Sequence, residues 1–187
     1  MKKWLFLILL FPLICVAQTY RYLGVEDGLS NRRVYCIQKD KTGYMWFLTH
    51  EGIDRYNGKE FKRYKLMDGD AEVNSLLNLN WLYIDQEGVL WEIGKKGKVF
   101  RYDQIHDCFS LVYKLPMESF SEQPDPVTYA WLDQNKHIWL CNKDTIFLYN
   151  TDTKQVTHIK NDISEEITDI EQIDESHFFI GTEMGIH

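Results

Sequence analysis

Residues 40–56 read DKTGYMWFLTHEGIDRY, and a related pattern returns twice further along the chain. Residues 85–102 read DQEGVLWEIGKKGKVFRY, and residues 133–149 read DQNKHIWLCNKDTIFLY. In each copy an Asp precedes a Trp by six residues, and a Tyr follows the Trp after ten or eleven. The three Trp residues are 45 and 48 residues apart. Such a period is typical of a repeat architecture in which each copy forms one structural unit.

A fourth copy begins at Ile167 and reads ITDIEQIDESHFFIGTEMGI. Asp174 and Phe179 take the places of the Asp and the Trp, with one residue fewer in the turn. Gly185 follows the marker aromatic by six residues, as Gly52 does in the first copy. The sequence ends at His187, inside this unit. We therefore expect three complete units and a partial fourth.

Within each copy the apolar residues recur at every second position, which indicates half-buried β-strands. Turn residues separate the strands: Asp bonds to nearby backbone, Gly accepts positive φ, and Asn-Gly favours a hairpin. In the first copy the expected strands are Val34–Lys39, Tyr44–Thr49, Ile53–Tyr56 and Glu60–Tyr64. In the third copy the closing strand is expected at 155–159.

Four short antiparallel strands about every 45 residues describe a β-propeller blade. The predicted fold class is therefore all-β, a segment of a propeller over residues 18–187. The blades are expected at about 32–65, 79–115, 127–160 and, in part, 167–187. Residues 66–78 and 114–126 are expected to be long joints between blades.

The N-terminus reads MKKWLFLILLFPLICVA over residues 1–17. A positive start, an apolar run and small residues before Gln18 predict a secretory signal peptide, too short for a comfortable membrane span. A lipoprotein signal would need a small residue before Cys15, where Ile14 stands. We expect an exported, periplasmic protein without a membrane span in residues 18–187.

The composition of 187 residues includes 28 acidic and 21 basic side chains, a net charge of −7. Removal of residues 1–17 takes two lysines and no acids, so the charge becomes −9. This balance argues against a nucleic-acid surface, which carries a basic stripe. The remaining cysteines are Cys36, Cys108 and Cys141, an odd number that cannot all pair within the chain. We expect buried thiols that act as small apolar residues.

Residues 27–64 carry marks of a known family: GLSN at Gly28–Asn31, then D-x-x-G-x-x-W-F, then G-I-D-R-Y-N-G. This stretch resembles the two-component regulator propeller repeat, and the later copies resemble weaker members. The resemblance extends over about residues 20–187. It implies the N-terminal periplasmic sensor part of a Bacteroidetes-type hybrid two-component system, in which a seven-bladed propeller is typical. The parent would be a homodimeric histidine kinase, anchored in the inner membrane by segments outside this chain.

The same resemblance implies an oligosaccharide ligand derived from glycans and control of polysaccharide-utilisation genes. It also makes this chain a fragment: it ends within the fourth blade and lacks every downstream domain, so no kinase residue can be assigned in it. A small closed propeller of four blades, with Tyr20–Leu23 as a closing strand, is the alternative. A truncated gene product is the expectation we prefer.

Several residue sets offer candidate chemistry. The four Asp residues suggest a carboxylate array, although capping of turns explains their fixed position. The aromatic markers suggest sugar platforms, although packing between blades explains their register. The sets are Asp40, Asp85, Asp133 and Asp174; Trp46, Trp91 and Trp139; and Tyr56, Tyr102 and Tyr149.

Metal and nucleophile chemistry receive little support. His137 and Cys141 are four apart on one strand, which is about 13 Å, and His106 and Cys108 lack a third ligand. Ser30 has no G-x-S-x-G context. We therefore assign no catalytic, metal or cofactor residue and expect no cofactor.

Ligand-binding residues stay unassigned at this level. Aromatic candidates near the joints are Trp81, Tyr113, Phe120 and Tyr129, and the basic turn at residues 95–98 could touch an acidic ligand. The first functional hypothesis is a sensor module without enzymatic activity of its own. The alternatives are a periplasmic propeller enzyme of the lyase or glycosidase type, which needs two convergent carboxylates, and a stand-alone protein-binding propeller.

Overall fold

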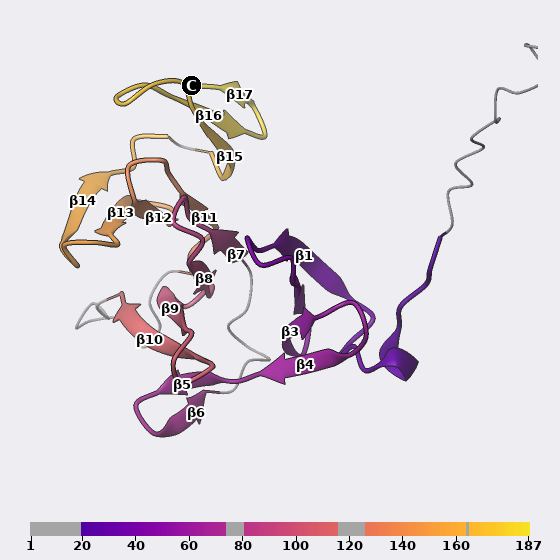
Figure 1. The fold of residues 1–187 in the computed structure, drawn as a ribbon. Helices are drawn as coiled ribbons and strands as arrows, with labels where there is room; N and C mark the ends of the chain where they lie inside the picture. Colours follow the sequence, from indigo (N-terminus) through magenta and orange to yellow (C-terminus); the bar gives the residue numbers. More distant parts are fainter. Residues whose placement is uncertain (1–19, 74–80, 116–125, 164) are drawn as a thin grey trace, which may run out of the picture.

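A computed structural model describes residues 20–73, 81–115, 126–163 and 165–187, which form four β-sheets arranged one after another around a common centre (Figure 1). The first strands of successive blades are β1 (Val34–Lys39), β7 (Trp81–Ile84), β11 (Tyr129–Leu132) and β15 (Ile167–Gln172), and they lie against one another near that centre. The remaining strands of each blade then lie side by side in chain order, and in the second sheet two further strands are added beyond the last one. This is the arrangement of propeller blades, and the all-β prediction is confirmed. The predicted signal peptide lies outside the described residues.

Three blades have the expected four antiparallel strands, and the fourth has three. Blade 1 contains β1 (Val34–Lys39), β2 (Met45–Thr49), β3 (Gly52–Tyr56) and β4 (Phe61–Tyr64). Blade 2 contains β7 (Trp81–Ile84), β8 (Leu90–Ile93), β9 (Lys98–Asp103) and β10 (Cys108–Lys114). Blade 3 contains β11 (Tyr129–Leu132), β12 (His137–Cys141), β13 (Thr145–Asn150) and β14 (Val156–Lys160). Blade 4 contains β15 (Ile167–Gln172), β16 (Phe178–Thr182) and β17 (Gly185–Ile186).

The first of the two expected joints is partly a hairpin. Strands β5 (Leu66–Asp68) and β6 (Ala71–Val73) form it, and β5 pairs in parallel with β10 at the outer edge of blade 2. The expected joint over 66–78 therefore contains a hairpin at 66–73, which the sequence analysis did not predict. The hairpin covers the edge of β10, where unpaired backbone groups would otherwise be exposed. Strands of three residues leave too little alternation to be recognised in the sequence.

The segment before β1 is tied to blade 1. A short 3-10 helix, η2 (Val25–Asp27), leads to Ser30, whose amide and hydroxyl both donate to Asp54 Oδ2, at 2.8 and 2.6 Å. Asn31 Nδ2 donates to Glu51 Oε1 at 3.1 Å. The GLSN motif thus anchors the entry of the chain onto blade 1. Residues 20–23 belong to no strand in the described chain, so the closing-strand alternative gains no support.

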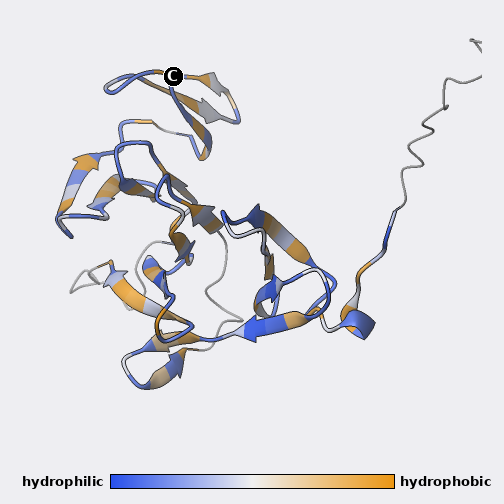
Figure 2. Cartoon of the chain, in the orientation of Figure 1, coloured by the Kyte–Doolittle hydropathy of each residue, from blue (hydrophilic) through white to orange (hydrophobic). Residues whose placement is uncertain are grey.

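The core is divided among the interfaces between neighbouring blades. Trp46 of blade 1 packs with buried residues of blade 2, Trp91 of blade 2 with those of blade 3, and Trp139 of blade 3 with those of blade 4. The three Trp side chains are 1%, 2% and 7% exposed. Hydrophobic and hydrophilic colours alternate along many strands, and the turns are mostly hydrophilic (Figure 2). Large aromatics fill the wedge between radially arranged sheets, as expected.

Candidate functional site

The repeated Asp residues are structural, as the capping interpretation predicted, but they do more than cap. Asp40 Oδ1 accepts hydrogen bonds from the backbone of Thr42 and Tyr44, while Oδ2 accepts from Trp46 Nε1 at 2.8 Å. The same indole bond joins Asp85 to Trp91 and Asp133 to Trp139, each at 2.9 Å. The spacing of six residues therefore reflects a side-chain bond across each turn.

In blade 4, Asp174 keeps the turn bonds to Ser176 and His177, and Phe179 offers no N–H. Each carboxylate is confined to its own blade, so the four do not converge. A carboxylate array of the kind that a glycosidase needs is therefore not formed by these residues.

The other aromatic candidates are also largely packed. Tyr113 stacks on Tyr149, with ring centroids 5.0 Å apart. The Tyr129 hydroxyl donates to Asp169 at 2.9 Å, and Trp81 packs against the core between blades 2 and 3. Phe120 lies outside the described residues. None of the three described candidates is presented on a free loop.

The cysteines and the metal candidates are separate from one another. Cys36, Cys108 and Cys141 form no disulfide with a described residue. Only Cys141 is fully buried, and burial raises the pKa of its thiol to about 12. The prediction of buried thiols is thus right for Cys141 and wrong for the half-buried Cys36 and Cys108. Among the residues with described positions, no group of three metal-ligating side chains comes together.

A groove of about 730 Å³ lies where blade 1 meets blade 2. It lies beside the turns that join β1 to β2 and β9 to β10. Aromatic and charged side chains share its wall: Tyr44, Tyr102, Arg55, Arg101, Asp103 and Asp107. The Arg55 guanidinium lies over the Tyr44 ring, 4.5 Å from its centroid. The groove combines flat apolar faces with hydrogen-bonding groups.

Asp107 is the central charge of this groove, and sequence reasoning missed it. Its Oδ1 accepts hydrogen bonds from the hydroxyls of Tyr64 at 2.7 Å and Tyr102 at 2.6 Å. Its Oδ2 accepts from Lys62, and Arg55 Nη1 is 3.8 Å from Oδ1. Partial burial opposes ionisation, but the bonds from Lys62, Tyr102 and Tyr64 hold the pKa of Asp107 well below its ordinary value. Burial and the Asp107 bond also raise the pKa of Tyr102 to about 12.

We expect Asp107→Asn to reduce the free energy of unfolding by about 1–2 kcal/mol at pH 7, less than a buried charged bond because the carboxylate is one-third exposed. Asn tolerates the left-handed backbone at this position, where φ is 51°. Because the folded pKa is lowered, this stability is present above 3.8 and is lost as the pH falls below it.

Urea unfolding at pH 7 and at pH 3 measures this difference. The difference in the free energy of unfolding between wild type and Asp107→Asn should be smaller at pH 3 than at pH 7. Asp70 is exposed, and Asp70→Asn should show no such difference at either pH. An equal gap at both pH values would mean that the charge of Asp107 contributes nothing.

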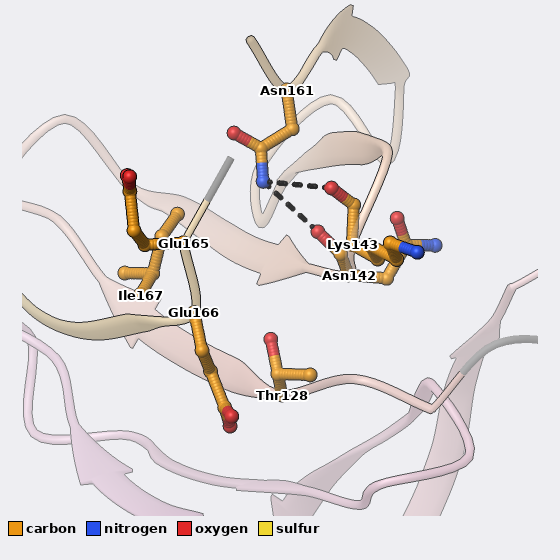
Figure 3. Close-up of a pocket in the computed structure, with 7 residues that line it drawn as sticks. All are labelled: Thr128, Asn142, Lys143, Asn161, Glu165, Glu166 and Ile167. Carbon is orange, nitrogen blue, oxygen red and sulfur yellow. Dashed lines mark hydrogen bonds between the residues drawn. The ribbon is translucent and has the colours of Figure 1, made fainter. Parts of the chain in front are cut away.

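A smaller pocket of about 250 Å³ lies between blades 3 and 4 (Figure 3). Asn161 closes one side, and its Nδ2 donates to the carbonyls of Asn142 at 3.1 Å and Lys143 at 3.3 Å. Glu165 and Glu166 lie on the facing segment, with Thr128 below (Figure 3). In the basic turn at 95–98, Lys98 Nζ lies 3.8 Å from Asp68 Oδ2, while Lys95 and Lys96 are exposed.

A comparison with known families finds a match to the first repeat of the chain. Residues 28–51 match the family model described as two component regulator propeller. This segment is similar to the two-component regulator propeller repeat. The match contains the GLSN motif, the Asp40 turn and Trp46, the features on which the predicted resemblance depended. The recognition of the repeat is confirmed.

Solved structures extend the likeness beyond this regulator propeller repeat. The extracellular domain of the putative hybrid two component system BT3049 from B. thetaiotaomicron is 26% identical, with a TM-score of 0.67 over 87% of this chain. The extracellular domain of BT4673 from the same organism is 20% identical, covers 91% of the chain and has a TM-score of 0.68, a likeness of fold. The chain spans 24% and 23% of these two structures, about a quarter of their length.

Virginiamycin B lyase from Staphylococcus aureus shares the propeller fold alone, at 16% identity and a TM-score of 0.60 over 86% of this chain and 56% of that one. No curated protein matches the sequence. Among the described residues there is no helix long and apolar enough to cross a membrane.

Proposed function

We propose that this chain is a ligand-sensing propeller segment of the exported, periplasmic region of a hybrid two-component system. The observation that carries the proposal is the 26% identity, over 87% of the chain, to the extracellular domain of BT3049, together with the regulator propeller repeat at 28–51. A sensor needs a site whose occupation biases a conformational equilibrium. The joints between blades are suited to this, because a ligand there contacts two blades at once.

The ligand class we propose is an oligosaccharide released from a glycan. The groove between blades 1 and 2 supports this choice: aromatic faces from Tyr44 and Tyr102 lie beside the charged groups of Arg55 and Asp103. Ligand sites combine apolar walls with a few polar groups that fix orientation. In this proposal the parent is a homodimeric kinase of the inner membrane, and binding switches on polysaccharide-utilisation genes.

A thermal-shift screen of the purified protein against oligosaccharides of defined class tests the binding part. A ligand at 100 times its Kd stabilises the folded state by about 2.7 kcal/mol. For a domain of this size that corresponds to a rise in Tm of about 5–10 °C. We expect such a rise with one oligosaccharide class and none with its constituent monosaccharides. The absence of any rise with every class tested would contradict the proposed ligand.

A further inference from the structure

The joint between blades 2 and 3 repeats the layout of the joint between blades 1 and 2. In the register of the sheets Arg55 pairs with Trp46, and Arg101 pairs with Trp91. Tyr64 and Tyr113 hold equivalent places on the last strands, opposite Ile53 and Val99. Each joint thus brings an Arg and a Tyr from the earlier blade to the later one.

The later blade contributes a Tyr and a turn residue to each joint. Tyr102 and Tyr149 occupy equivalent strand positions, and the turn that follows has the same length in both blades. Five residues after each Tyr stand Asp107 and Lys154, with left-handed φ angles of 51° and 62°. Asp107 and Lys154 are therefore the same position in two blades, with opposite charge.

In the joint between blades 1 and 2 this position supplies a carboxylate. Tyr64 and Tyr102 donate to Asp107, and Arg55 lies 3.8 Å from it. In the joint between blades 2 and 3 the same position supplies an ammonium group instead, and Lys154 Nζ lies 5.9 Å from the centroid of the Tyr149 ring. The Tyr149 hydroxyl, in a residue only 1% exposed, has no hydrogen-bond partner among the described residues.

The two cations of this second joint lie over the same ring. Arg101 Cζ is 5.9 Å and Lys154 Nζ 5.7 Å from the centroid of Trp91. Burial and the positive charge of Arg101 both lower the pKa of Lys154. Arg101 forms no ion pair with any residue whose position is described. A like-charge pair of this kind is stabilised by an anion.

The acidic groups nearby are already occupied. Asp85 accepts from the Trp91 indole and from the amides of Glu87 and Val89. Glu87 and Asp152 share the ammonium group of Lys136. A cavity of about 310 Å³ opens beside the cations, and Asp85, Glu87 and Asp152 line it together with Trp91, Arg101, Thr151 and Lys154. Lys154 Nζ donates to the Thr151 carbonyl, but no carboxylate pairs with Lys154 or Arg101 among the described residues, and the cavity is large enough to admit an anionic group to them.

We propose that this cavity binds the acidic group, carboxylate or sulfate, of an oligosaccharide, which supplies the negative charge that Asp107 supplies in the preceding joint. The saccharide part of this inference rests on the proposed function; the anion site rests on the two joints alone. Arg and Lys form charge-assisted hydrogen bonds with such groups, and Arg does so with two parallel N–H donors. The Trp91 ring forms part of the wall beside the acidic sugar.

Isothermal titration of the purified protein at pH 7 and constant ionic strength tests the site. The probes are trigalacturonate, its neutral methyl ester, a sulfated heparin disaccharide and sodium sulfate. We expect at least one acidic saccharide to bind, and any neutral counterpart to bind at least about tenfold more weakly, because a charged hydrogen bond contributes about that factor or more. Acidic saccharides that bind no more tightly than the methyl ester would overturn the inference.

Three variants locate the binding. Lys154→Asp should weaken binding of the acidic saccharide at least tenfold, and so should Arg101→Leu, since blade 3 has Leu148 at the equivalent position. Arg101 also lines the groove between blades 1 and 2, so Lys154→Asp is the variant that locates the site. Lys143→Asp makes the same charge change in the same blade, beside the pocket of Figure 3, and should leave the affinity unchanged. Without ligand, Lys154→Asp should raise Tm, because Arg101 and Tyr149 gain an acceptor, while Lys143→Asp should not.

The outcomes separate the two proposals. If Lys154→Asp neither weakens the binding of acidic saccharides nor raises Tm, the proposed anion site is wrong. The proposed sensing function would then still hold for neutral glycans. If sodium sulfate binds as tightly as the saccharides, the cavity takes a free anion, and the saccharide part is overturned.

Discussion

Replacing Trp91 with Ala is expected to lower the free energy of unfolding by about 3–5 kcal/mol, the range for large aromatic truncations in a core. The side chain is 2% exposed and lies in the interface between blades 2 and 3. Its removal leaves a cavity there and takes the indole N–H from Asp85. Urea unfolding, monitored by far-ultraviolet circular dichroism instead of tryptophan fluorescence, measures the change in the free energy of unfolding.

Two further variants make the measurement specific. Trp91→Phe keeps an aromatic ring and loses the N–H donor, so its cost should be smaller, about 1–3 kcal/mol. Met184→Ala truncates a side chain that is 81% exposed and should change stability by less than about 0.5 kcal/mol. A Trp91→Ala protein as stable as the wild type would show that the blades do not depend on this packing.

Glu92 is expected to reduce stability at neutral pH, so Glu92→Leu should raise the free energy of unfolding by about 2 kcal/mol or more at pH 7. The residue lies on β8 directly after Trp91, with no exposed surface, and neither carboxylate oxygen has a hydrogen-bond partner within the described chain. The equivalent position of blade 3 holds Leu140, so the blade geometry accepts leucine there.

The stabilising effect of Glu92→Leu should depend on pH. Burial raises the pKa of Glu92 well above 4.5, so the folded state holds its proton more tightly than the unfolded state. The stability of the wild type therefore falls as the pH rises above 4.5, and the advantage of Glu92→Leu should grow between pH 4 and pH 7. Glu92→Gln, which keeps an unpaired amide, should gain less. A Leu variant that is less stable than wild type at pH 7 would mean that Glu92 has a partner.

Much of the blade architecture was predictable from periodicity. The expected strand Val34–Lys39 coincides with β1, and Tyr44–Thr49 starts one residue before β2. The constant position of Trp46, Trp91 and Trp139 indicated packing between blades, which the core confirms. These features recur in several copies along the chain, and a pattern that recurs is more reliable than one seen in a single segment.

The site was less predictable, because it depends on what differs between blades. The bond from Asp40 to the Trp46 indole needs a turn geometry that spacing alone does not give. The sequence already contained the opposite charges of Asp107 and Lys154 at equivalent positions, since each residue lies five residues after its marker Tyr. Its significance is clear only from the structure, in which Asp107 lies beside Arg55 and Lys154 lies over the Trp91 ring, each in the preceding blade.

The most direct test of the sensing role is the transcriptional response of the native host. Cells with the gene intact and cells with the gene deleted would receive the same oligosaccharide panel, followed by RNA sequencing. The account predicts that one oligosaccharide class induces polysaccharide-utilisation genes in the intact strain and fails to do so in the deletion strain. Identical induction in both strains, across every class tested, would contradict it.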